Sequence, residues 1–213
     1  MKAEGVIKKL YKELRREYGK PLGQWKLWCK RPKTEKEREE VIIGAILTQR
    51  TNWKNVELAL NNLKGAREDS LKDIYQLGFK KLAPLIRPAG FYKTKARYLF
   101  NLAKFIVENY GGLEKMKKSE LKELREELLE LKGIGPETAD SILLYALDKP
   151  IFVIDEYTRR LARARNLPGE TDYHSLQKLF RESLRRDYGL YQDFHALIVI
   201  NGKKYGNKNK KFK

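Results

Sequence analysis

Apolar residues follow a helical spacing along almost the whole chain, and this pattern restricts the fold more than any other feature. Clear examples are the segments 41–46 (VIIGAI), 98–107 (YLFNLAKFIV) and 139–146 (ADSILLYA). Residues that recur at intervals of three and four lie on one face of a helix. The one run with strand character, 151–154 (IFVI), is too short and isolated to make a sheet. The sequence therefore predicts an all-α protein.

The chain is strongly basic. Its 213 residues include 46 Lys and Arg against 28 Asp and Glu, which gives a formal charge of +18. A charge excess of this size attracts polyanions, most often nucleic acid. Surplus lysine also occurs in surface ion-pair networks of proteins from hot environments. Charge by itself leaves open DNA, RNA and an anionic membrane surface.

Cysteine content and hydropathy restrict the class further. Cys29 is the single cysteine, so a disulfide framework or a cysteine-ligated zinc or iron–sulfur site is not expected. The first residues lack the apolar core of a signal peptide, and no stretch approaches the roughly 20 apolar residues that span a bilayer. We expect a soluble, intracellular protein of the cytoplasm that does not enter a membrane.

The segment 131–140, LKGIGPETAD, is the most informative motif. Gly133 and Gly135 flank Ile134 between two amphipathic helical patterns, and glycine permits backbone conformations that a Cβ would resist. Pro136 suits the first turn of the following helix. The N–H groups at that helix start suit a DNA phosphate. An ordinary glycine-bearing turn is the alternative.

A longer block, LKGIGPETADSILLYALDKPIFVIDEYTRRLARA, resembles the helix-hairpin-helix signature of the endonuclease III superfamily of DNA glycosylases. The resemblance covers most of the chain. The segment EVIIGAILTQRTNWKNV resembles the family's early helix and glutamine-bearing turn, and GFYKTKARYL resembles its Gly-aromatic-x-x-Lys-Ala segment. The segment FHALIVINGKKYG resembles the part that leads into the cluster-binding cysteines of endonuclease III.

The resemblance implies two helical lobes with the active site in the cleft between them. We expect residues 36–140 to form a central bundle that carries the hairpin, and residues 1–35 and 141–213 to form the second lobe. The charged segment 30–40, which contains Pro32, is interpreted as a connector. The expected partner is double-stranded DNA with a damaged base, bound by a monomer.

Asp155 is the candidate catalytic residue. Asp is a preferred N-cap and this position begins a helix, so capping alone would explain it. The resemblance assigns Asp155 the essential carboxylate of the family. Breaking an N-glycosidic bond builds positive charge on the sugar, which a carboxylate stabilises, or the carboxylate orients the attacking water.

Two departures from endonuclease III refine the expected reaction. Bifunctional members carry a Schiff-base lysine where this chain has Glu137, which cannot supply an amine. The four cluster cysteines are absent after Tyr205, so no iron–sulfur cluster is expected. Both features resemble the cluster-free bacterial 3-methyladenine DNA glycosylases. The implied reaction is monofunctional hydrolysis of an alkylated purine nucleotide, which leaves an abasic site.

The resemblance also implies a pocket for a flipped base and several contacts with DNA. Aromatic rings favour a cationic, electron-poor purine, although tryptophan is more often packed in a core. The candidates for the base pocket are Trp25, Trp28, Trp53, Lys203 and Lys204, with surface lysine as the alternative for at least one of the last two. The candidates for DNA binding are Gln49, which would fill the gap left by the flipped nucleotide, Phe91, Tyr92 and Lys93 on the opposite strand, and Gly133, Ile134, Gly135 and Thr138 of the hairpin.

A monovalent cation is the one ion that the resemblance implies. Backbone carbonyl groups of Leu129, Leu131 and Ile134 would hold it between the hairpin and a phosphate. His174 and His195 are too far apart in the sequence to indicate a metal site, and both are interpreted as structural.

Two other functions stay open at this point. The chain could be a glycosylase for mismatched thymine or uracil, or for an oxidised base with AP-lyase activity. It could also be a non-catalytic DNA-binding module that uses the hairpin alone.

Overall fold

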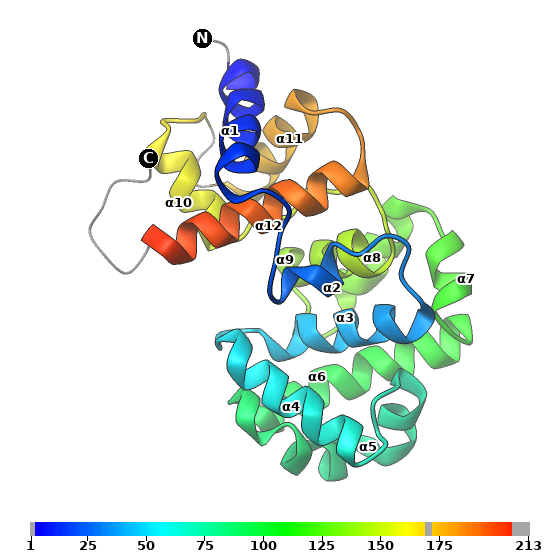
Figure 1. Ribbon diagram of the computed structural model, residues 1–213. Helices are drawn as coiled ribbons and strands as arrows, with labels where there is room; N and C mark the ends of the chain where they lie inside the picture. Colours follow the sequence, from blue (N-terminus) through cyan, green and yellow to red (C-terminus); the bar gives the residue numbers. More distant parts are fainter. Residues whose placement is uncertain (1–2, 169–171, 206–213) are drawn as a thin grey trace. The chain divides into compact units, whose positions relative to one another are not determined.

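The computed structural model describes residues 3–168 and 172–205, and within these ranges every regular element is a helix (Figure 1). The all-α prediction is confirmed. The chain forms two compact units. The central unit comprises residues 32–147, and the terminal unit comprises residues 1–31 and 148–213.

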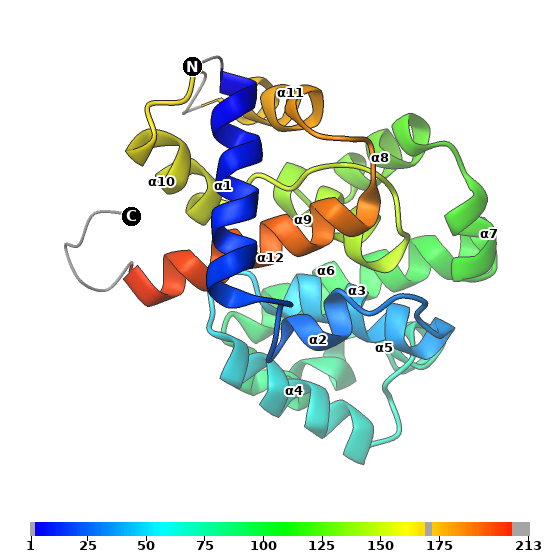
Figure 2. The same cartoon turned by 45° about the horizontal axis from the view of Figure 1, so that its top comes forward.

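The terminal unit is a small helical bundle around a cluster of aromatic rings. Its helices are α1 (Ala3–Tyr18), α2 (Trp25–Trp28), α10 (Glu156–Ala164), α11 (Tyr173–Ser183) and α12 (Tyr188–Tyr205). In Figure 2, α1 runs across α12 and contacts both α11 and α12. Phe152 stacks on Phe180 with ring centroids 4.4 Å apart, and Phe194 lies 5.7 Å from both rings. The apolar run 151–154 is therefore a fully buried segment outside the helices, and Asp155 follows it directly.

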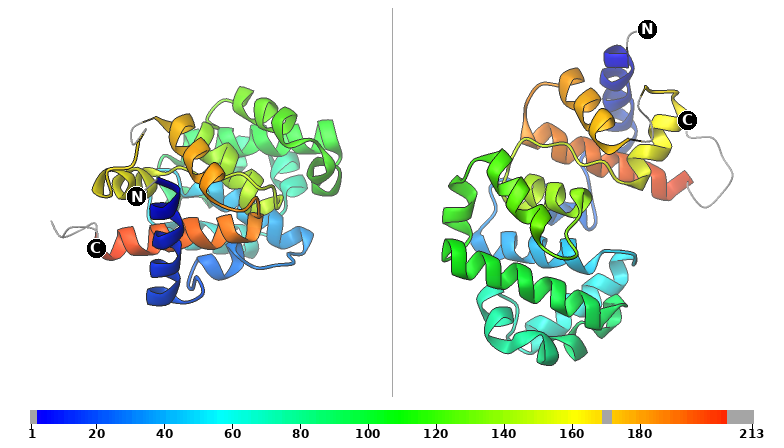
Figure 3. Two further views of the ribbon diagram at one scale, coloured as in Figure 1. Left: turned by 90° about the horizontal axis from the view of Figure 1, so that it is seen from above. Right: turned by 180° about the vertical axis from the view of Figure 1, so that it is seen from behind.

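The central unit is built around α3 (Glu35–Leu47), in which every side chain from Val41 to Leu47 is buried. A helix that is apolar all round belongs in the middle of a bundle. The surrounding elements are α4 (Trp53–Gly65), α5 (Leu71–Leu85), η1 (Arg87–Ala89), α6 (Tyr92–Phe105), η2 (Ile106–Tyr110), α7 (Leu113–Lys118), α8 (Leu121–Glu130), α9 (Pro136–Ser141) and η3 (Ile142–Ala146). The views of Figure 3 show α5 and α6 side by side, and they share the largest helix–helix contact of the described residues.

The boundaries of the central unit differ from the predicted 36–140 at both ends. The charged segment 30–40 is not a connector beyond Thr34, because α3 already begins at Glu35. Thr34 and Glu37 form a capping box, in which Thr34 N–H donates to Glu37 Oε2 at 2.9 Å and Glu37 N–H donates to Thr34 Oγ1 at 3.3 Å. At the other end, η3 packs against α3, and the buried Arg38 donates to the Ala146 carbonyl, so the unit continues to Leu147.

No helix within residues 3–168 and 172–205 has both the length and the apolar character needed to cross a bilayer.

Candidate functional site

Asp155 is the N-cap of α10, and its carboxylate is held on one side by Thr158. Oδ1 accepts a hydrogen bond of 2.7 Å from Thr158 N–H and one of 2.9 Å from Thr158 Oγ1. The side chain is buried, with 8 % of the residue exposed. Asp155 thus does cap a helix, as the simpler interpretation required, but its second oxygen takes no part in the cap.

That second oxygen faces His195 of α12. His195 Nε2 lies 3.5 Å from Asp155 Oδ2, which is an ion-pair contact when the imidazole is protonated. Burial by itself raises the pKa of Asp155. The positive charge of His195 and the hydrogen bonds from Thr158 outweigh it, so the pKa is lowered below its usual value. Asp155 is consequently ionised at neutral pH.

Two of the predicted base-pocket residues lie near this carboxylate. The ring of Trp25 meets His195 edge-on, with centroids 5.9 Å apart. Lys203 Nζ donates to Gln24 Oε1 at 2.9 Å, although the residue is exposed overall. Partial burial lowers the pKa of the Lys203 ammonium, and the negative charge of Asp155 opposes that shift. The terminal unit therefore brings an aromatic ring, a cation and an anion together.

The three remaining pocket candidates have different contacts. Trp28 packs edge-on against Trp25 at 5.6 Å and is buried. Lys204 Nζ donates to Glu17 Oε1 at 3.2 Å and lies 5.2 Å from the ring centroid of Tyr18, so it joins the end of α1. Trp53 belongs to the central unit, where its Nε1 donates to Glu57 Oε1 at 2.9 Å. The alternative that the sequence left open, a lysine on the surface, therefore applies to Lys204.

The predicted hairpin is a tight turn between α8 and α9. Gly133 has φ +92°, and Ile134 N–H donates to the Leu131 carbonyl at 3.0 Å. The Ile134 side chain is buried. Gly135 is the N-cap of α9, and Pro136 occupies its first turn. The turn therefore leaves the N–H groups at the start of α9 without partners inside the helix.

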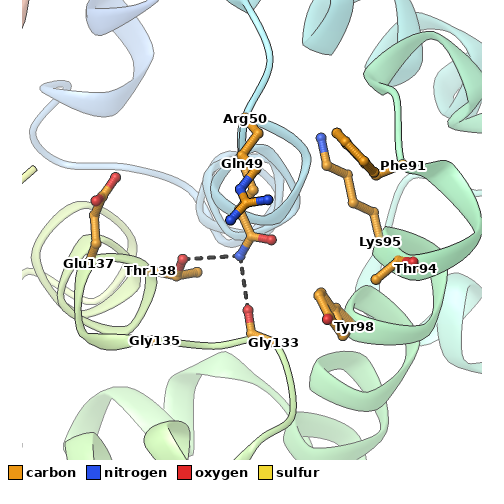
Figure 4. Close-up of a pocket in the computed structure, with 10 residues that line it drawn as sticks. All are labelled: Gln49, Arg50, Phe91, Thr94, Lys95, Tyr98, Gly133, Gly135, Glu137 and Thr138. Carbon is orange, nitrogen blue, oxygen red and sulfur yellow. Dashed lines mark hydrogen bonds between the residues drawn. The ribbon is translucent and has the colours of Figure 1, made fainter. Parts of the chain in front are cut away.

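Gln49 lies against this hairpin. Its Nε2 donates to the Gly133 carbonyl at 3.0 Å and to Thr138 Oγ1 at 3.1 Å (Figure 4). Residues predicted as DNA contacts from positions more than 80 apart in the chain are thus in direct contact. They line a pocket of about 530 Å³ in the central unit, with Phe91, Tyr98 and Glu137 also in its wall. Phe91 is 67 % exposed and in a left-handed conformation, φ +47°.

Lys95, the lysine of the Gly-aromatic-x-x-Lys-Ala segment, connects the segments that carry Gln49 and Phe91. Its Nζ donates to the Leu47 carbonyl at 2.7 Å and to the Ala89 carbonyl at 2.8 Å. Burial lowers its pKa to about 8. Tyr92 is half-buried and Lys93 is exposed beside Phe91. Lys95 therefore fixes the end of α3 against the turn that precedes α6.

The hairpin backbone has the right chemistry for the implied monovalent cation. Leu131 has a non-helical ψ of 123° directly after α8, so carbonyl groups at the end of this helix lack their usual partners. The Leu131 oxygen accepts from Ile134 N–H and keeps one lone pair. These donors are neutral oxygens. No cluster of His, Cys, Asp and Glu with metal-binding geometry occurs among the described residues.

Gly133→Ala is expected to destabilise the central unit, whereas Gly135→Ala is its matched control. A Cβ on Gly133 would lie 2.3 Å from the Tyr98 ring, and its positive φ disfavours any side chain. A Cβ on Gly135 meets nothing within 4 Å, and φ there is −91°. Urea unfolding should show that the free energy of unfolding falls by about 1–3 kcal/mol for Gly133→Ala but not for Gly135→Ala. Equal stability of both variants would contradict the observed packing.

Comparisons with known proteins identify the family. Residues 43–186 match the model of the HhH-GPD superfamily, described as base excision DNA repair proteins. A Methanocaldococcus jannaschii protein named "putative DNA repair glycosylase" is 50% identical over 176 residues, which cover 80% of this chain and 79% of the relative. Endonuclease III of Thermotoga maritima is 29% identical over 160 residues, covering 72% and 71%.

A solved structure is similar over nearly the full length of both chains. It is the 3-methyladenine DNA glycosylase of H. pylori, bound to 1,N6-ethenoadenine. The identity is 31% and the TM-score 0.78, with 96% of this chain and 98% of that chain covered. A trapped endonuclease III–DNA complex also superimposes, with a TM-score of 0.75 at 17% identity, which shows a shared fold.

Proposed function

Because the chain belongs to the HhH-GPD superfamily of base excision DNA repair proteins and is a DNA glycosylase, we propose that it is a monofunctional enzyme that excises an alkylated purine from double-stranded DNA. It works as a monomer and leaves an abasic site. The observation that carries the proposal is the buried, ionised Asp155 in a chain that has Glu137 in place of the Schiff-base lysine.

The chemistry follows from the two oxygens of Asp155. When the bond between C1′ of the sugar and the base nitrogen breaks, the electron pair leaves with the base and positive charge develops on the sugar. The carboxylate stabilises that charge, and Oδ2 accepts a hydrogen bond from the water that adds to C1′. The proton of that water passes to the carboxylate and then to solvent. Since Thr158 fixes Oδ1, the anion does not need to reorganise during the reaction.

The choice of base rests on two supports. The H. pylori relative is a 3-methyladenine glycosylase that was solved with an ethenoadenine, and it is 31% identical over 96% of this chain. In this chain the buried indole of Trp25 meets His195 edge-on, and His195 in turn contacts the carboxylate. An electron-rich ring there favours a cationic alkylpurine, whose glycosidic bond is already weakened.

Glu137 supports hydrolysis without strand cleavage. It is exposed in the wall of the central pocket, at the position of the bifunctional lysine in the resemblance. A carboxylate cannot form a Schiff base with the sugar. Iron–sulfur chemistry forms no part of the proposal, because the chain has one cysteine. A monovalent cation on the carbonyl groups of Leu129, Leu131 and Ile134 would neutralise a bound phosphate at the hairpin.

An excision assay tests this function. The enzyme is incubated with duplexes that each contain one lesion: 3-methyladenine, ethenoadenine, uracil, thymine opposite guanine, or an oxidised base. We expect release of the free alkylpurine, strand breaks only after alkali, and no covalent adduct with borohydride. Failure on every alkylated purine would overturn the substrate class. Efficient borohydride trapping would instead indicate a bifunctional lyase.

A further inference from the structure

The two oxygens of Asp155 have different neighbours. Thr158 donates both of its hydrogen bonds to Oδ1, whereas Oδ2 faces the Nε2 atom of His195 at 3.5 Å. Thr158 belongs to the same helix start as Asp155, but His195 comes from α12, 40 positions later in the chain. The free oxygen therefore depends on a contact between two separate helices.

His195 is held rigidly in that position. The residue is 4 % exposed. Its imidazole is met edge-on by Trp25, with an interplanar angle of 87°, and by Phe152 at 90°. Phe152 itself is fixed by its stack on Phe180. Close-packed aromatic rings leave the imidazole little freedom to rotate.

We propose that His195 is a positioning residue, which orients Asp155 through its second oxygen, keeps it ionised, and thereby sets the acid limit of base excision. This inference rests on the proposed catalytic role of Asp155. His195 acts through Asp155 and takes no part in bond breaking. His195 would then have a functional role, where the sequence alone indicated a structural one.

The physical basis is the cost of a buried anion. A carboxylate removed from water takes up a proton more readily unless an opposite charge or hydrogen bonds stabilise it. His195 supplies the largest of the effects that lower the pKa of Asp155, ahead of Thr158. Without His195, the effect of burial is no longer offset and the pKa of Asp155 rises. The neutral carboxylic acid of Asp155 then persists to higher pH.

Other titratable groups near Asp155 act at alkaline pH. Burial raises the pKa of Tyr157, and the charge of Asp155 raises it further. Lys203 of α12 also interacts with Asp155, whose negative charge opposes the lowering of the Lys203 pKa by burial. The neighbours Trp25, Phe152 and Thr158 do not titrate. Among these neighbours, His195 is thus the group that most strongly favours the ionised form of Asp155.

Two variants separate positioning from packing. His195→Phe keeps an aromatic ring but removes the charge and the donor, and His195→Gln keeps a donor near the Nε2 position without the charge. His174, the second of the two histidines, is exposed on α11, so His174→Phe is the matched control. Single-turnover excision is measured across the pH range, and the Asp155 side-chain carboxyl is titrated by ¹³C NMR, with its signal assigned from Asp155→Asn.

We expect His195→Phe to lose up to about tenfold in excision rate at the acid end of the profile, below both carboxyl midpoints, and to regain the wild-type rate near pH 8, which corresponds to a rise of about one pH unit in the Asp155 midpoint. His195→Gln should lie between His195→Phe and the wild type. The His174→Phe profile should overlie the wild type. An equal loss at every pH, or an unchanged carboxyl midpoint in His195→Phe, would overturn the proposal.

Two further outcomes remain decisive. If the wild-type enzyme excises none of the lesions, the proposed function fails, but the carboxyl titration still decides the relation between His195 and Asp155. If His195→Phe does not fold, His195→Gln decides alone. A neutral amide lacks the positive charge and must still raise the carboxyl midpoint.

Discussion

Asp155→Asn is expected to lower base excision by about 100- to 1,000-fold or more, while the variant folds and binds DNA like the wild type. Asn has the same shape and is an equally good N-cap, so its side-chain oxygen still accepts from Thr158 N–H. What disappears is the negative charge that stabilises the developing sugar cation. Activity and capping, which Asp155 combines, are thereby separated.

The matched control is Asp172→Asn. Asp172 is the N-cap of α11 and accepts from Ser175 N–H at 2.7 Å, but it is exposed. The same chemical change there should leave the excision rate unchanged. Single-turnover excision and fluorescence anisotropy with lesion-bearing duplex measure the two effects. A wild-type excision rate for Asp155→Asn would contradict the catalytic role. If the wild type and Asp155→Asn bind DNA equally well and neither excises a base, the protein is a DNA-binding module.

The hairpin could be predicted from sequence because its determinants are local. Gly133, Ile134 and Gly135 lie together between two helical patterns, and the structure adds only the reason for Gly133, the Tyr98 ring beside its α-carbon. The start of α3 was misinterpreted for the opposite reason. Its first turn is charged and follows Pro32, which is typical of a connector, although Thr34 and Glu37 carried the capping-box signal.

The residues that the sequence did not reveal depend on contacts between distant segments. His195 has helical spacing on an apolar face, and nothing in that spacing indicates that its Nε2 meets Asp155. Lys95 belongs to the Gly-aromatic-x-x-Lys-Ala segment, but that motif does not indicate that it binds two carbonyl groups at the ends of other elements. Periodicity assigns a residue to a face of a helix but does not identify the residue that it meets.

The ion pair between Arg125 and Asp140 connects the two helices on either side of the hairpin. Arg125 lies on α8 before the turn and Asp140 on α9 after it. Arg125 Nε donates to Oδ1 at 2.7 Å and Nη2 donates to Oδ2 at 3.2 Å, which is a bidentate pair. Asp140 is fully buried. The pair therefore joins the two helices that the turn itself connects only through its backbone.

Arg125→Met is expected to destabilise the protein by about 3–5 kcal/mol, because it leaves the Asp140 carboxylate buried without its charged partner. The double variant Arg125→Met/Asp140→Leu should recover most of this loss, since an apolar pair of similar volume needs no compensation. Arg185→Met is the matched control: Arg185 pairs with Asp187 at 2.6 Å but is 79 % exposed, so the cost should stay below about 1 kcal/mol. Urea unfolding measures the stability of all three variants. The affinity for DNA should also fall for Arg125→Met, because the ion pair that joins the two helices of the hairpin is lost. A double variant no more stable than Arg125→Met would show that packing around these side chains, rather than the unpaired charge, causes the loss.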